Sequence, residues 1–158
     1  MIRTQQACCF TGHREISDRD LIQLPGRLDS QTRALIEEGI VDFITGGARG
    51  FDTLAALSVL RLRREFPQIR LILALPCREQ TKGWRQTEKQ CYDEILKLAD
   101  WVHYSSDSYD RGCMMRRNRF MVDHSVCCVF YLKNRRSGTY KTVQYAMEQE
   151  LRLCNILL

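Results

Sequence analysis

Residues 40–57 read IVDFITGGARGFDTLAAL, and this stretch indicates the class of the fold. Its first six residues form a short, largely apolar run, which is typical of a strand buried on both faces of a parallel sheet. Glycines occupy positions 46, 47 and 50, and apolar side chains then recur at helical spacing over residues 51–66. A strand, a glycine-rich turn and a helix in this order make up one unit of an α/β fold.

The same alternation continues through the rest of the chain. We expect further strands at residues 7–11, 70–75, 101–104 and 126–132, while residues 154–158 are either a sixth strand or the end of a helix. Helical patterns cover residues 28–38, 87–99, 114–124 and 139–153, and Thr87 is expected to cap the second of these. This alternation predicts a three-layer Rossmann-like sandwich of the α/β class, with a mainly parallel five- or six-stranded sheet.

Composition narrows the class of protein. A length of 158 residues suits a single domain over 1–158, and 44% hydrophobic with 27% charged residues excludes a disordered or fibrous chain. No apolar run approaches the ~20 residues that cross a bilayer, so we expect no membrane partner. The eight cysteines include no CxxC pair, and several lie within apolar runs. We therefore expect no metal site, reduced thiols and a cytoplasmic location.

One edge of the predicted sheet carries the unusual residues. In open parallel sheets, ligands bind beyond the carboxyl ends of the strands, where the strand order reverses. The loops at that edge are rich in glycine and arginine, and glycine loops that lead into helices suit a phosphate or carboxylate. The expected ligand-binding residues are Thr11, Gly12, His13, Arg14, Gly46, Gly47, Arg49, Gly50, Asp52, Pro76, Trp84, Arg116, Arg117, Asn118, Ser137, Gly138 and Thr139.

Several of these residues also have an ordinary structural interpretation. Asp52, the candidate catalytic residue, either pairs with the dipole of its own helix or acts on a ligand, as a ribose acceptor or in acid–base chemistry. Trp84 either packs or covers a base, and Thr139 is expected to cap the last helix. Asn118 interrupts an apolar helical face that includes Met114, so its amide must bond either backbone or a ligand.

Two further features have open interpretations. Arg116 and Arg117 lie near the start of a predicted helix, where the helix dipole disfavours cations. They indicate either an anion-binding site or a solvated arginine cluster. His13 is a candidate proton donor, although no carboxylate partner is evident from the sequence.

Motifs of one known family occur in order along nearly the whole chain: CFTGHR (9–14), TGGARGFD (45–52), LPC (75–77) with Trp84, RRN (116–118) and SGT (137–139). With them the chain resembles the YpsA-like branch of the SLOG superfamily, which also holds the LOG phosphoribohydrolases and the DprA/Smf DNA-processing proteins. The resemblance implies a bacterial protein that binds a nucleotide or nucleotide-derived ligand, related to NAD or ADP-ribose, in a sensing or regulatory role. No other cofactor is expected.

The chain departs from the LOG pattern at one position. LOG enzymes carry a catalytic glutamate in a PGGxGTxxE element, and Thr142 stands where that glutamate would be. The alternatives to ligand binding are N-glycosidic hydrolysis of a nucleotide through Asp52 and DprA-like binding of single-stranded nucleic acid. Nucleic acid ranks last as a partner, because a formal net charge of +5 is mild. Superfamily relatives are often oligomers, so a homo-oligomer is a further expectation.

Overall fold

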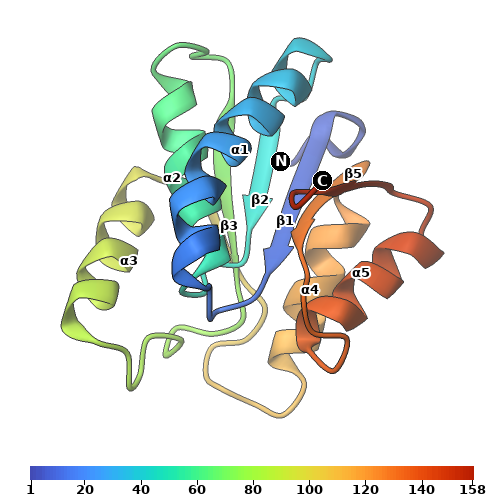
Figure 1. The fold of residues 1–158 in the computed structure, drawn as a ribbon. Coiled ribbons are helices and arrows are strands. Elements are labelled where there is room, and N and C mark those ends of the chain that lie inside the picture. The colour runs from blue at the N-terminus through green and yellow to red at the C-terminus, as the bar shows by residue number, and fades with distance from the viewer.

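The computed structural model describes residues 1–158 as a six-stranded sheet between two layers of helices (Figure 1). The strand order is β4-β3-β2-β1-β5-β6, and every neighbouring pair is parallel. The α/β class predicted from the sequence is confirmed, and the sixth strand is present. The strands are β1 (Ala7–Gly12), β2 (Asp42–Thr45), β3 (Arg70–Leu75), β4 (Trp101–Tyr104), β5 (Cys127–Tyr131) and β6 (Arg152–Asn155).

Five α-helices follow the strands, after a short 3-10 helix (Thr4–Gln6) at the start of the chain. The α-helices are α1 (Asp18–Glu37), α2 (Phe51–Arg63), α3 (Gln86–Leu98), α4 (Cys113–Asp123) and α5 (Gly138–Glu148). No helix of the structure is both long and apolar enough to cross a bilayer.

The predicted start of α1 and the predicted cap of α3 were wrong. Helix α1 begins ten residues before the expected position, because Ser17 caps it by accepting a hydrogen bond from the N–H of Asp20 (3.2 Å), and the helix continues through Pro25. Helix α3 begins at Gln86, so Thr87 lies inside the helix and does not cap it. The side chain of Glu88 accepts a hydrogen bond from the backbone N–H of Arg85 (3.0 Å) at that end.

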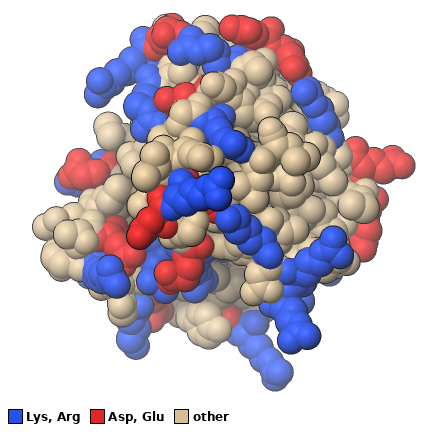
Figure 2. Space-filling model, viewed as in Figure 1, with Lys and Arg blue, Asp and Glu red and all other residues tan.

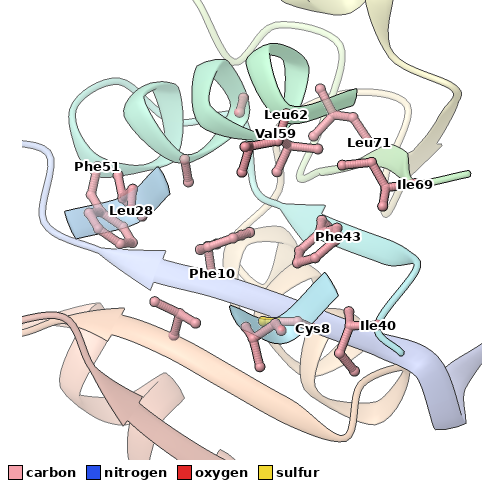
Figure 3. Packing of buried hydrophobic residues seen from close by; sticks show 14 of the residues in the cluster. Cys8, Phe10, Leu28, Ile40, Phe43, Phe51, Val59, Leu62, Ile69 and Leu71 are labelled. Carbon is pink, nitrogen blue, oxygen red and sulfur yellow. The ribbon is translucent and has the colours of Figure 1, made fainter. Parts of the chain in front are cut away.

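The strands are apolar throughout because helices cover both faces of the sheet. Alternate residues of β1 point to opposite sides: Cys8 and Phe10 belong to the core beneath α1, α2 and α3, whereas Cys9 packs with residues of α4 and α5. In the larger core, the Phe10 ring lies 6.1 Å from that of Phe43 and 6.5 Å from that of Phe51, centroid to centroid (Figure 3). All eight cysteines are free thiols.

The strand order reverses between β1 and β5. From β1 the sheet extends through β2, β3 and β4 in one direction, and through β5 and β6 in the other. Because crossovers are right-handed, the reversal places α1–α3 on one face and α4–α5 on the other (Figure 1). The loops that leave β1 and β5 therefore diverge, and such a divergence leaves a crevice at the carboxyl edge of the sheet.

Candidate functional site

A cavity of about 550 Å³ opens at this crevice, within the size range of small-molecule sites. Most of its lining comes from the end of β1 with the loop that follows it and from the loop after β5 with the start of α5. Ala48, the start of α2 and one side of α4 complete it. The lining residues are Thr11, Gly12, His13, Arg14, Glu15, Ala48, Asp52, Met114, Arg117, Asn118, Met121, Lys133, Asn134, Ser137, Gly138 and Thr139.

Asp52 lies in the first turn of α2 and is 6% exposed. Its Oδ2 atom accepts a hydrogen bond from the backbone N–H of Ala48 (3.2 Å), whereas Oδ1 has no partner within the protein. Burial raises the pKa of Asp52 to about 6, although the nearby Arg117 charge, the Ala48 N–H and Arg14 oppose the rise. Near neutral pH the cavity therefore contains a carboxylate close to its titration point.

Arg117 is the buried cation of the site and is 4% exposed. Its Nη1 atom donates to the carbonyl oxygens of Gly46 and Ala74, the latter at 3.4 Å, and its Nε atom donates to Oδ1 of Asn118 (2.8 Å). These bonds tie α4 to the ends of β2 and β3. Burial lowers the pKa of Arg117 and the charge of Asp52 opposes this. The Oδ1 atom of Asn118 thus accepts a hydrogen bond from the side chain of Arg117, and not from backbone or a ligand.

Arg116 has a different role from Arg117. It points away from the cavity and pairs with Asp110 (2.6 Å), which also accepts hydrogen bonds from the hydroxyl of Ser106 (2.7 Å) and the N–H of Gly112 (2.9 Å). Arg116 therefore fastens the loop before α4, and only Arg117 reaches the cavity.

His13 joins the loop after β1 to the loop after β5. Its Nε2 atom accepts hydrogen bonds from the backbone N–H groups of Lys133 (2.7 Å) and Asn134 (3.1 Å). Because both partners are donors, Nε2 carries a lone pair and the ring proton lies on Nδ1. Burial lowers the pKa of His13, which favours this neutral form. His13 thus connects the loops, and its Nε2 atom has no proton to donate to a ligand.

The loop after β5 is held in place before it leads into α5. Ser137, and not Thr139, caps the helix, since its Oγ atom accepts from the N–H of Tyr140 (3.2 Å). Lys133 forms an ion pair with Asp20, and the hydroxyl of Tyr131 donates to the same carboxylate (2.6 Å). These two donors hold the pKa of Asp20 at about 2.

Three lining side chains are more than nine-tenths buried and still carry a polar atom without a partner. Thr11 is 6% exposed, Asp52 is 6% exposed and Thr139 is 8% exposed. The hydroxyls of both threonines and Oδ1 of Asp52 make no hydrogen bond within the protein, yet none of these atoms is sealed from the cavity. Buried polar groups are normally satisfied, so these atoms point to a bound molecule or to water in the cavity.

The structure brings together ten of the expected ligand-binding residues around the cavity: Thr11, Gly12, His13, Arg14, Asp52, Arg117, Asn118, Ser137, Gly138 and Thr139. The others do not line it: Gly46, Gly47, Arg49, Gly50, Pro76, Trp84 and Arg116.

Structural contacts account for several residues of the second group. Trp84 packs edge-on against Tyr92, with ring centroids 5.5 Å apart. Arg49 lies 3.5 Å from the carboxylate of Glu15. Gly50 has a φ of 80° and packs against the backbone of Arg14 with no space for a Cβ atom, so it is required by the fold.

Six lining residues were not among those expected: Glu15, Ala48, Met114, Met121, Lys133 and Asn134. Lys133 and Asn134 lie in the loop after β5, so the carboxyl-edge rule that selected Ser137 applies equally to them. Met114 and Met121 lie on the helical face of Asn118 and could have been found from that spacing. No three His, Cys, Asp or Glu side chains converge in the structure as metal ligands would.

Comparisons with known proteins agree with this architecture. A family model described as the YspA SLOG family matches residues 9–155. The uncharacterized SPbeta prophage-derived protein YoqJ of Bacillus subtilis is 32% identical over 142 residues, which cover 79% of this chain and 83% of YoqJ. A UPF0398 protein of Halalkalibacterium halodurans is 30% identical over 109 residues, which cover 68% of this chain and 58% of that protein.

Two solved structures share the fold at low sequence identity. DNA processing protein A from Helicobacter pylori, which has a unique single-stranded DNA binding mode, superposes with a TM-score of 0.70 at 18% identity. DNA processing protein A (DprA) from Streptococcus pneumoniae gives 0.68 at 16% identity. Each match covers 96% of this chain but only 65% and 50%, respectively, of the larger proteins.

Asp52→Asn is expected to change how stability depends on pH. A carboxyl whose pKa rises from 3.8 to about 6 on folding contributes stability that is full below pH 3.8 and lost as the pH rises through 6. Relative to wild type, the variant should gain about 2 kcal/mol in unfolding free energy between pH 4 and pH 7. Urea denaturation at both pH values measures this, with the exposed Asp93→Asn as control. A difference independent of pH would contradict the assignment.

Gly46→Ala is expected to destabilise the fold. A Cβ atom at this position would lie 2.5 Å from Nη1 of Arg117 and 2.9 Å from Oδ2 of Asp52, and both atoms are held by hydrogen bonds in buried side chains. We expect a loss of about 1–3 kcal/mol in unfolding free energy. Gly26→Ala in α1 meets no atom within 4 Å and is the matched control. Equal effects of the two substitutions would show that the space beside Arg117 is not limiting.

Proposed function

The chain belongs to the YspA SLOG family, and we propose that its cavity binds a phosphorylated, nucleotide-like small molecule in a sensing or regulatory role. The observation that carries the proposal is the set of unpartnered polar atoms on Thr11, Asp52 and Thr139, three side chains that are more than nine-tenths buried around one cavity. A molecule with both anionic and hydroxyl groups would satisfy them, because the cavity offers donors for an anion and acceptors for hydroxyl groups.

One side of the cavity is suited to a phosphate. The backbone N–H groups of Gly138 and Thr139, at the start of α5, donate no hydrogen bond within the protein. The positive end of the helix dipole adds to their attraction for an anion. Arg14 lines the same cavity and makes no ion pair or hydrogen bond, so its guanidinium is free to bind phosphate oxygens.

The surface charge near this side is also positive. Figure 2 shows Lys and Arg side chains gathered at the lower right, where Figure 1 places α5 and the loop that leads into it. That loop includes Lys133, Arg135 and Arg136. A positive rim raises the local concentration of an anionic ligand and speeds its entry.

The other side of the cavity is suited to hydroxyl groups. Oδ1 of Asp52 can accept a hydrogen bond, and the hydroxyl of Thr11 can either donate or accept one. The amide of Asn118 adds a donor, because its oxygen is already engaged by Arg117. A ribose offers hydroxyls for such groups, and its 5′-phosphate would extend toward α5.

Binding without turnover is the form of the proposal that the residues favour. At the position of the LOG glutamate, the Thr142 hydroxyl donates to the carbonyl oxygen of Gly138 (3.0 Å) within α5, so it stabilises the helix and supplies no carboxylate. Asp52 is the one buried acid of the cavity, and one of its oxygens is bonded to Ala48. Release of free base from AMP, lost in Asp52→Asn, would instead support a hydrolase.

Arg14→Gln is expected to weaken the binding of AMP. The substitution removes a free guanidinium from the cavity and breaks no hydrogen bond or ion pair of the protein, so the fold should be unaffected. A charge-assisted hydrogen bond contributes about 1.5–3 kcal/mol, so the Kd measured by calorimetry should rise by about tenfold or more. Arg64→Gln, exposed just after α2, is the control for the loss of one positive charge. An unchanged Kd would remove Arg14 from the site.

The affinity for AMP is also expected to depend on pH through Asp52. A ligand hydroxyl that donates to the carboxylate favours its ionised form, so binding should weaken as the pH falls through about 6. Because a phosphate monoester also titrates near pH 6, Asp52→Asn supplies the reference. Wild type should exceed the variant in affinity at pH 8, and this advantage should shrink by pH 5. A constant ratio across this range would contradict hydroxyl recognition by Asp52.

A further inference from the structure

No aromatic side chain in the lining of the cavity is free to stack on a nucleobase. Trp84, which the sequence suggested as a cover for a base, packs instead against Tyr92 away from the cavity. Phe51 and Tyr131 are fully buried and stack on each other, with ring centroids 5.8 Å apart and planes inclined by 18°. None of these rings lines the cavity, so none is available to a ligand.

His13 carries the only aromatic ring among the lining residues, and this ring already packs and hydrogen-bonds within the protein. Its ring packs edge-on against Tyr131, with centroids 5.7 Å apart, and its Nε2 atom accepts two backbone hydrogen bonds. To stack on a base, the imidazole would have to leave both loops that it connects.

The apolar part of the lining is also small. It consists of Ala48, Met114 and Met121, and Met121 is only 2% exposed. The free polar groups, by contrast, match the chemistry of a sugar phosphate: N–H groups and a guanidinium for the phosphate, and carboxylate and hydroxyl oxygens for sugar hydroxyls. The cavity therefore offers specific partners to the phosphate and the ribose of a nucleotide, and no aromatic partner to its base.

We infer that the cavity recognises a pentose phosphate and that the base of a nucleotide contributes little to binding. This inference rests on the proposed function, because it assumes that a phosphorylated ligand enters the cavity. The base would lie at the open side, toward solvent. Stacking on an aromatic side chain raises affinity by roughly 5- to 150-fold per base, and that gain should be absent here.

Calorimetry with the full chain tests the inference. The ligands are ribose 5-phosphate, AMP, GMP, CMP and UMP, with ribose, adenosine and inorganic phosphate as references. We expect Kd values for the five sugar phosphates that agree within about tenfold, weaker binding of inorganic phosphate, and no binding of ribose or adenosine. Asp52→Asn should remove most of the advantage of ribose 5-phosphate over inorganic phosphate, and the exposed Asp93→Asn should not.

Every other outcome contradicts either the inference alone or both the inference and the proposed function. A spread above about tenfold among the sugar phosphates, or binding of adenosine, would overturn the inference and leave the proposed function standing. Inorganic phosphate that binds as tightly as ribose 5-phosphate would overturn the inference too, because the sugar would then contribute nothing. If no phosphorylated compound binds, both the inference and the proposed function fail.

Discussion

The burial of one guanidinium constrains most of the candidate site. A charge inside a protein must be compensated, and Arg117 is compensated by carbonyl oxygens at the ends of two strands and by the amide of Asn118. This arrangement fixes the distance between α4 and the sheet and requires a residue without a side chain at position 46. It also places a fixed positive charge near Asp52, which opposes the cost of burying that carboxylate. The glycine loop (residues 46–50) thus accommodates the buried charges of Arg117 and Asp52.

The strand order supplies the second condition for the site. Because β1 lies between β2 and β5, the loops that follow these three strands meet at one edge of the sheet. His13 joins the loop after β1 to the loop after β5, because its Nε2 atom accepts hydrogen bonds from the backbone of the second loop. The ion pair between Lys133 and Asp20 anchors the loop after β5 to α1. The start of α5 is therefore presented to the cavity in a fixed position, as selective anion binding requires.

The architecture and the position of the cavity could be predicted from the sequence, because buried parallel strands are apolar throughout and ligands bind where they end. The bounds of α1 could not, since Pro25 and Gly26 resemble a helix break and only tertiary packing of the apolar stripe overrides them. Arguments from charge alone likewise could not decide which of Arg116 and Arg117 reaches the cavity. Helical phase decides it: Arg117 follows Met114 by three residues and precedes Met121 by four, so it lies on the inward face.

For the glycine loop, the sequence predicted the right edge of the sheet but the wrong backbone N–H groups for binding an anion. A GGxxG run before a helix is typical of a phosphate-binding turn, but here the N–H of Ala48 bonds Asp52, and Gly46 makes room for Arg117. The free N–H groups that face the cavity lie instead at the start of α5. The carboxylate of Asp52 costs stability when it is ionised, and the hydroxyls of Thr11 and Thr139 have only water or a ligand as hydrogen-bond partners. Selection for stability alone would remove such groups, so their presence favours a binding role over a purely structural one.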